Sequence, residues 1–146
     1  MRVVCDTAPL IAAADRSSRA HRLAAGLVNR LGRKLVVLEV VLAETDYMLR
    51  ARVGATSARR LLEAVVTGAH SAAFLSPGLL RRATELDAQY ADLDLGLVDA
   101  SIMAYAERHQ LPILTFDFRD FRATSSTHGP WRLVLSEDVL AKATTR

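Results

Sequence analysis

Two acidic residues of this sequence directly follow short apolar runs. Asp6 comes after the β-branched run Val3–Cys5, and Asp117 comes after the run Ile113–Phe116. Both runs are predicted to be buried strands, so both carboxylates are expected at the carboxyl ends of strands, where α/β sheets bind their ligands. An aspartate in this position also commonly caps the helix that follows, and this structural role stays open for both residues.

Two further acids, Glu44 and Asp99, are predicted to project from apolar helix faces. Residues three and four positions away are neighbours on a helix. Around Glu44 these neighbours are Val40, Val41, Tyr47 and Met48, and around Asp99 they are Leu95, Gly96, Ile102 and Met103. A carboxylate in apolar surroundings costs several kcal/mol unless it is paired, hydrogen-bonded or bound to a cation. A buried ion pair is one solution, with Arg2, Arg50 or Arg119 as the partner.

A divalent metal ion is the other solution. Its predicted ligands are the acids at the two strand ends and on the two helices: Asp6, Glu44, Asp99 and Asp117. Carboxylate oxygens without cysteine or histidine ligands favour Mg²⁺ or Mn²⁺. The histidines lack metal-ligand spacing; they are His21, His70, His109 and His128. Sites of this kind hydrolyse phosphodiesters, because the metal activates water and no protein nucleophile is needed.

The sequence lacks the motifs of several other enzyme classes. There is no glycine-rich phosphate loop, no G-x-S-x-G, no H-E-x-x-H and no C-x-x-C. Their absence excludes P-loop, serine-hydrolase, zinc-protease and thioredoxin chemistry. A phosphatase with Asp6 as its nucleophile remains a weaker alternative. It leaves Glu44 without a role, and Ala8 stands where such an enzyme has a second acid.

The composition is that of one globular domain. The chain has 146 residues, of which 51% are hydrophobic and 24% charged, and this excludes bulk disorder. The single cysteine, Cys5, forms no intramolecular disulfide and fits a cytoplasmic protein. Asp6 and Pro9 interrupt the apolar segment that a secretory signal needs, and the longest uncharged run, Ala64–Leu80, is too polar for a membrane span. The net charge of +3 favours an anionic partner such as nucleic acid.

Strands and helices are predicted to alternate along the chain. The expected strands are Val3–Cys5, Leu35–Leu38, Ala72–Leu75, Pro112–Phe116 and Trp131–Leu135. The expected helices are Pro9–Ala14, one capped by Ser17 or Ser18, Glu39–Arg52, one from Thr56 or Ser57 to Gly68, Pro77–Ala91, Leu97–Gln110 and one capped by Ser136, with a frayed tail over 142–146. This alternation predicts an α/β fold, a single domain over 1–146 with a mostly parallel central sheet and helices on both faces.

Four short motifs resemble those of the PIN-domain ribonucleases, in particular the VapC-like toxins of type II toxin–antitoxin systems. They are Asp6-Thr7, Ala43-Glu44, Val98-Asp99-Ala100-Ser101 and Leu114-Thr115-Phe116-Asp117-Phe118-Arg119-Asp120-Phe121. They occur in the family's order between Val3 and Phe121, each in the expected strand or helix context.

The resemblance implies a metal-dependent endoribonuclease that cuts structured RNA, commonly tRNA or rRNA, and inhibits translation until a VapB-like antitoxin neutralises it. It assigns four acids as catalytic residues and as ligands of Mg²⁺ or Mn²⁺: Asp6, Glu44, Asp99 and Asp117. It gives Thr115 a supporting role in orienting Asp117 or a water, and it places Asp120 close enough to compete as a ligand. It also implies a homodimer that forms a heterotetramer or larger assembly with the antitoxin, whose C-terminal segment occupies a groove beside the active site.

Basic side chains for contacts with RNA are plentiful. The candidates are Arg16, Arg19, Arg22, Arg30, Arg33, Lys34, Arg50, Arg52, Arg59, Arg60, Arg81 and Arg82. Contacts with phosphates give salt-sensitive and largely sequence-independent affinity. Aromatic residues make up only 5% of the chain, so recognition of RNA shape is favoured over base stacking. The non-enzymatic alternative is a PIN-like module that has lost catalysis and binds RNA or protein, and the four acids argue against it.

Overall fold

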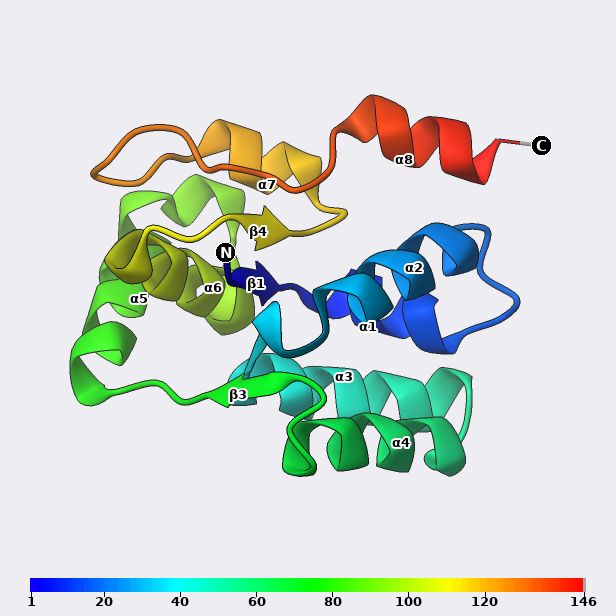
Figure 1. Ribbon diagram of the computed structural model, residues 1–146. Helices are drawn as coiled ribbons and strands as arrows, with labels where there is room; N and C mark the ends of the chain where they lie inside the picture. Colours follow the sequence, from blue (N-terminus) through cyan, green and yellow to red (C-terminus); the bar gives the residue numbers. More distant parts are fainter. Residues whose placement is uncertain (146) are drawn as a thin grey trace.

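A parallel sheet forms the centre of the protein in a computed structural model that describes residues 1–145. Its strands are β1 (Val3–Cys5), β2 (Leu35–Leu38), β3 (Ser71–Ala73) and β4 (Ile113–Leu114). They lie in the order β3-β2-β1-β4 (Figure 1), and every neighbouring pair is parallel. Val3 pairs with Leu35, and Cys5 pairs with Leu114. The predicted α/β class is therefore confirmed.

Helices surround this sheet and pack against one another in pairs. They are α1 (Thr7–Ala14), α2 (His21–Leu31), α3 (Glu39–Arg52), α4 (Ala55–Val66), α5 (Pro77–Gln89), α6 (Gly96–His109), α7 (Phe118–Ala123) and α8 (Glu137–Thr144), with 3₁₀ turns at Gly32–Lys34 and Ala91–Leu93. α1 packs against α2, α3 against α4 and α5 against α6, as Figure 1 shows. Because α3 also contacts α1 and α6, it connects the α1–α2 pair with the α5–α6 pair.

Burial explains why these segments form strands and helices. All side chains of β1 and β2 are buried, as expected for apolar runs in a parallel sheet that is covered on both faces. In α6 every residue from Ala100 to Glu107 is buried, so this helix runs through the core instead of lying on the surface. α6 contacts β1 directly, and this packing fixes the position of Asp99, which lies in the first turn of the helix.

The far end of the sheet differs from the prediction. The expected strand Trp131–Leu135 is wrong: the segment makes one isolated parallel bridge between Leu133 and Ile113. The expected strand Pro112–Phe116 shortens to Ile113–Leu114, because the chain then turns and Asp117 caps α7, a helix that the sequence analysis missed. With a partner of only two residues, a further full strand has little to pair with.

Several element boundaries also need correction. α2 begins at His21 without a side-chain cap; the predicted cap Ser18 accepts a hydrogen bond from the Ala20 amide in the turn before it. β3 lies at Ser71–Ala73, slightly earlier than predicted. Residues 142–144 of the predicted tail belong to α8, and Arg146 lies outside the described residues.

Other expectations at the helix ends are confirmed. Ser76 accepts a hydrogen bond from the Leu79 amide at the start of α5, and Ser136 accepts one from the Val139 amide at the start of α8. Within residues 1–145, no helix is long and apolar enough to cross a membrane.

Candidate active site

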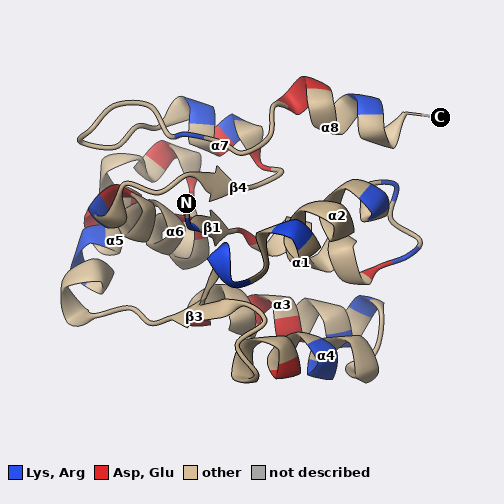
Figure 2. Cartoon of the chain, viewed as in Figure 1, with Lys and Arg blue, Asp and Glu red and all other residues tan. Residues whose placement is uncertain are grey.

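The carboxyl ends of β1 and β4 bring Asp6 and Asp117 to one edge of the sheet. The two strands are parallel neighbours, and the Asp6 amide continues their ladder by donating to the Leu114 carbonyl at 2.9 Å. In Figure 2 the chain is acidic directly after both strands. Both residues also perform the structural role, since Asp6 caps α1 and Asp117 caps α7. The capping role and a place in the site are therefore compatible.

Thr115 connects these two strand ends. It is almost fully buried, and its hydroxyl donates to Asp6 Oδ2 at 2.7 Å while accepting from the Asp117 amide at 2.9 Å. The other Asp6 oxygen, Oδ1, accepts from the Thr7 amide at 2.7 Å. Thr115 thus fixes the Asp6 carboxylate and the backbone at Asp117 together, and its predicted supporting role gains a definite geometry.

The helices α3 and α6 complete the site with Glu44 and Asp99. Both side chains line a cavity of about 490 Å³ together with Asp6 and Asp117. α3 and α6 contact each other, which explains how acids so far apart in sequence meet. The structure therefore brings all four predicted site residues to one cavity, and their roles in catalysis and metal binding stay predictions.

Three helices begin at this cavity. Asp6 is the N-cap of α1, Asp117 is the N-cap of α7, and Asp99 lies in the first turn of α6. A helix N-terminus carries a partial positive charge and free amide groups, which stabilise carboxylates. The backbone thus offsets part of the repulsion among the clustered acids.

Asp120 belongs to the same cluster. One carboxylate oxygen each from Asp99, Asp117 and Asp120 lie within 4.8 Å of one another. The Asp120 amide also donates to Asp117 Oδ1 at 3.3 Å. A set of carboxylate oxygens this close is a donor set suited to Mg²⁺ or Mn²⁺, so the residues fit the ion that the sequence predicts. The geometry leaves Asp120 as an alternative or additional ligand.

Within the described part of the chain, no arginine forms a salt bridge with the helical acids Glu44 and Asp99. The predicted ion-pair partners are engaged elsewhere: Arg50 pairs with Asp46 at 3.0 Å, and Arg2 donates to the Tyr105 hydroxyl at 3.5 Å. Arg119 lies 3.9 Å from Asp120 and is largely exposed. Among residues 1–145, neither Glu44 nor Asp99 forms a salt bridge, so the ion-pair explanation fails.

The negative charges change the acidity of the cluster. Burial, together with the charges of Asp6, Asp117 and the other clustered acids, raises the pKa of Asp99 from 3.8 to about 7. Burial also raises the pKa of Asp6, although the hydrogen bonds from Thr115 and Thr7 oppose this effect. The pKa of Asp120 is raised by burial and by Asp117. A site of mutually repelling carboxylates is one that a cation would stabilise.

The raised pKa of Asp99 predicts a pH-dependent stability of the metal-free protein. The folded state holds the Asp99 proton up to about pH 7, whereas the unfolded chain releases it near 3.8. The free energy of unfolding therefore falls as the pH rises through this window, by on the order of 1–2 kcal/mol once solvent screening is allowed for.

Thermal denaturation in chelator, at about pH 5 and about pH 8, measures this loss. The variant Asp99→Asn should lose less stability than the wild type over the same interval, because its amide does not titrate. Equal losses for the two proteins would show that Asp99 titrates normally in the folded state.

A partly buried ion pair away from the site was not predicted from the sequence. Arg82 on α5 donates through Nε to Glu107 Oε1 at 2.7 Å and through Nη2 to Oε2 at 3.1 Å. Glu107 also accepts from the Thr127 amide at 3.0 Å. Arg82 is thus committed to the fold, as is Arg50 through its pair with Asp46, and neither is a free candidate for RNA contacts.

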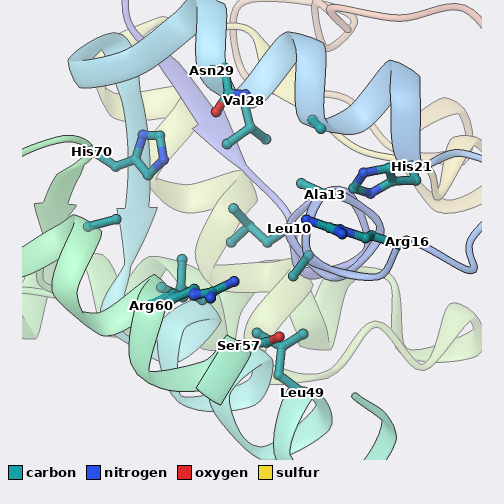
Figure 3. Close-up of a pocket in the computed structure, with 14 residues that line it drawn as sticks. Leu10, Ala13, Arg16, His21, Val28, Asn29, Leu49, Ser57, Arg60 and His70 are labelled. Atoms are coloured by element: carbon teal, nitrogen blue, oxygen red, sulfur yellow. The ribbon is translucent and has the colours of Figure 1, made fainter. Parts of the chain in front are cut away.

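A second cavity, of about 390 Å³, lies among α1, α2 and α4 (Figure 3). Leu10 stands at its centre in Figure 3, and nitrogen-bearing side chains surround it: Arg16, His21, Asn29, Arg60 and His70. A backbone carbonyl orients each imidazole: Nδ1 of His21 is hydrogen-bonded to the Ala12 carbonyl, and Nδ1 of His70 to the Gly32 carbonyl. None of the described residues that line this cavity is acidic.

Comparison with known proteins agrees with this architecture. The family model of the PIN domain matches residues 3–126. Ribonuclease VapC26 of Mycobacterium tuberculosis is 30% identical over 128 residues, which are 87% of this chain and 95% of that protein. The chain therefore belongs to the PIN domain family, and the predicted VapC-like resemblance is confirmed.

Solved structures share the fold at lower identity. VapC20 of Mycobacterium tuberculosis, described as a sarcin-ricin loop cleaving toxin, matches with a TM-score of 0.73 and 19% identity, covering 80% of this chain and 91% of that one. VapBC2 of Rickettsia felis, solved with a DNA fragment from its promoter, matches with a TM-score of 0.63 and 15% identity over 84% and 92% of the two chains.

Proposed function

We propose that the protein is a metal-dependent endoribonuclease toxin of the VapC type that acts on structured RNA and is neutralised by a VapB-like antitoxin. The observation that carries the proposal is the cavity at the sheet edge, where Asp6, Glu44, Asp99 and Asp117 meet and, among residues 1–145, form no salt bridge with an arginine. Such a cluster is unfavourable unless a cation binds it. Membership of the PIN family and the similarity to Ribonuclease VapC26 support RNA as the substrate.

The residues present can hold Mg²⁺ or Mn²⁺ through the carboxylates of Asp99, Asp117 and Asp120, with Asp6 and Glu44 lining the same cavity. When bound, the metal supplies Lewis acidity, which polarises a phosphoryl oxygen and makes water more acidic. The protein itself contributes by positioning the carboxylates. Thr115 holds the Asp6 carboxylate through a hydrogen bond of 2.7 Å, and the starts of α1, α6 and α7 favour negative charge at the cavity.

The carboxylates can also accept a proton from the attacking water. A carboxylate of the cluster that is not bound to the metal is the group suited to this role. The phosphatase alternative is disfavoured by the surroundings of Asp6. Both of its oxygens accept hydrogen bonds, from Thr7 and Thr115, and the side chain is buried, so it is poorly placed to attack a phosphate.

Incubating the purified protein with total bacterial RNA tests the proposal. The reaction is run with Mg²⁺, with Mn²⁺ and with chelator, and the new RNA ends are mapped by sequencing. We expect cleavage at a few sites with either metal and none with chelator. Cleavage that persists in chelator would contradict metal dependence, and no cleavage of any RNA would favour the alternative of a binding module without catalysis.

The cavity among α1, α2 and α4 is our candidate for the groove that receives the antitoxin segment (Figure 3). Its apolar centre at Leu10 and the positive charge of Arg16 and Arg60 suit an amphipathic segment with acidic side chains. The variant Arg60→Glu is expected to weaken antitoxin capture in copurification. Unchanged capture would place the antitoxin elsewhere.

A further inference from the structure

One face of α3 runs along the wall of the acidic cavity. Glu44, Met48 and Arg52 are spaced four residues apart, so they share a face of the helix, and all three line the cavity. The rise of an α-helix places Arg52 roughly 12 Å along the axis from Glu44. The cavity therefore has carboxylates at one end and a guanidinium toward the other.

Arg52 is not committed to another partner. Within residues 1–145 it forms no salt bridge, whereas Arg50, two positions earlier, pairs with Asp46 at 3.0 Å. Asp15 lines the same cavity, but its Oδ1 accepts hydrogen bonds from the amide and the hydroxyl of Ser17. The guanidinium of Arg52 is thus exposed and available for an anion at the edge of the cavity.

Apolar side chains also line the cavity. They are Ile11, Met48 and the partly exposed Phe116. A cavity of about 490 Å³ is large enough for a nucleoside, since ligand sites commonly span several hundred Å³. A cavity that combines carboxylates, apolar side chains and a guanidinium suits RNA, in which a sugar and base separate successive phosphates.

We propose that this cavity binds the nucleotide next to the cleaved phosphodiester, and that Arg52 binds the phosphate on the far side of that nucleotide. The inference rests on the proposed ribonuclease function and adds a substrate-positioning residue to it. Arg52 acts on substrate binding and not on the chemical step, because it lies at the opposite end of the cavity from the clustered acids.

The affinity for RNA tests this assignment with a matched pair of variants. Fluorescence anisotropy follows binding of a short single-stranded RNA to the wild type, Arg52→Ala and Arg50→Ala, with Ca²⁺ in place of Mg²⁺. Arg52→Ala should weaken binding by roughly three- to tenfold and lower the salt slope by about one, as expected for the loss of one phosphate contact. Arg50→Ala should bind within about twofold of the wild type, since its guanidinium is held by Asp46.

The variant Arg52→Lys should regain most of the affinity, because a lysine also supplies the positive charge. Thermal denaturation verifies that each variant is folded. Equal affinity of Arg52→Ala and the wild type, or equal losses in Arg52→Ala and Arg50→Ala, would overturn the inference. A wild type that binds RNA through Arg52 but cleaves none would contradict the proposed function and leave this contact standing.

Discussion

Replacing Asp99 by asparagine is expected to reduce RNA cleavage by roughly 10²–10⁴-fold, since a bound metal's Lewis acidity is worth several kcal/mol of transition-state stabilisation. Asp99 faces the largest set of negative neighbours: the charges of Asp6, Asp117, Asp120 and Glu44 all raise its pKa. The amide keeps the size of the side chain but removes its charge and its proton acceptor. Metal affinity, measured by calorimetry, should fall together with the cleavage rate.

The fold should survive this replacement. Without metal the neutral amide removes repulsion, so Asp99→Asn is expected to melt at a higher temperature than the wild type in chelator at neutral pH. Asp92→Asn provides the matched control, because Asp92 is exposed in the short turn before α6. Cleavage by Asp99→Asn at the rate of the Asp92→Asn control would remove Asp99 from the mechanism.

The second large effect concerns stability. Arg82 binds the nearly buried Glu107 carboxylate through two hydrogen bonds, Nε–Oε1 at 2.7 Å and Nη2–Oε2 at 3.1 Å. Removing the Arg82 side chain leaves this carboxylate without its bidentate partner. Loss of one partner from a buried pair costs several kcal/mol, and the partial exposure of Arg82 reduces this. We expect Arg82→Ala to lower the free energy of unfolding by roughly 2–4 kcal/mol, as measured by urea denaturation.

Arg81→Ala is the control for this prediction, since Arg81 is the exposed neighbour on the same helix. It should change the free energy of unfolding by no more than about 0.5 kcal/mol. The Glu107 carboxylate also accepts from the Thr127 amide, so Arg82→Ala should loosen the chain after α7 and speed hydrogen exchange at Thr127. A urea denaturation curve of Arg82→Ala that matches that of Arg81→Ala would show that the ion pair contributes nothing to the free energy of unfolding.

Much of the fold could be predicted because its signals are local. The strands β1 and β2 are continuous buried runs, and the serine caps Ser76 and Ser136 mark helix starts. The errors lie where tertiary context decides. Trp131–Leu135 has strand composition, but the neighbouring β4 is too short to extend it. α7 was missed because it is only six residues long, although a capping role had been left open for Asp117.

The site follows from topology as well as from composition. Asp6 and Asp117 were predicted to lie together because each follows a strand, and the ends of parallel strands meet at one edge of the sheet. Glu44 and Asp99 were predicted because their helical neighbours are apolar. The sequence could not decide between an ion pair and a metal, because the partners of the arginines depend on side-chain geometry. The structure shows that Arg50, one of the candidate partners, pairs with Asp46 instead, and the metal stays a prediction.

Two features had no usable signal in the sequence. Arg82 was indistinguishable from the other basic residues until its contact with Glu107, 25 positions away, was known. The cavity around Leu10 depends on the packing of α1 and α2 beside α4, which periodicity does not specify. Local sequence patterns do not determine long-range packing of this kind.

The most direct test of the central claim is an anomalous difference map from a crystal of the wild-type protein soaked in Mn²⁺. We expect a strong peak at the sheet edge, coordinated by the carboxylates of Asp99 and Asp117, and the map would also show which of Asp6 and Asp120 completes the set. A map with no peak among these acids at saturating Mn²⁺, or with its peak at another site, would contradict the assignment of the cluster as a metal centre.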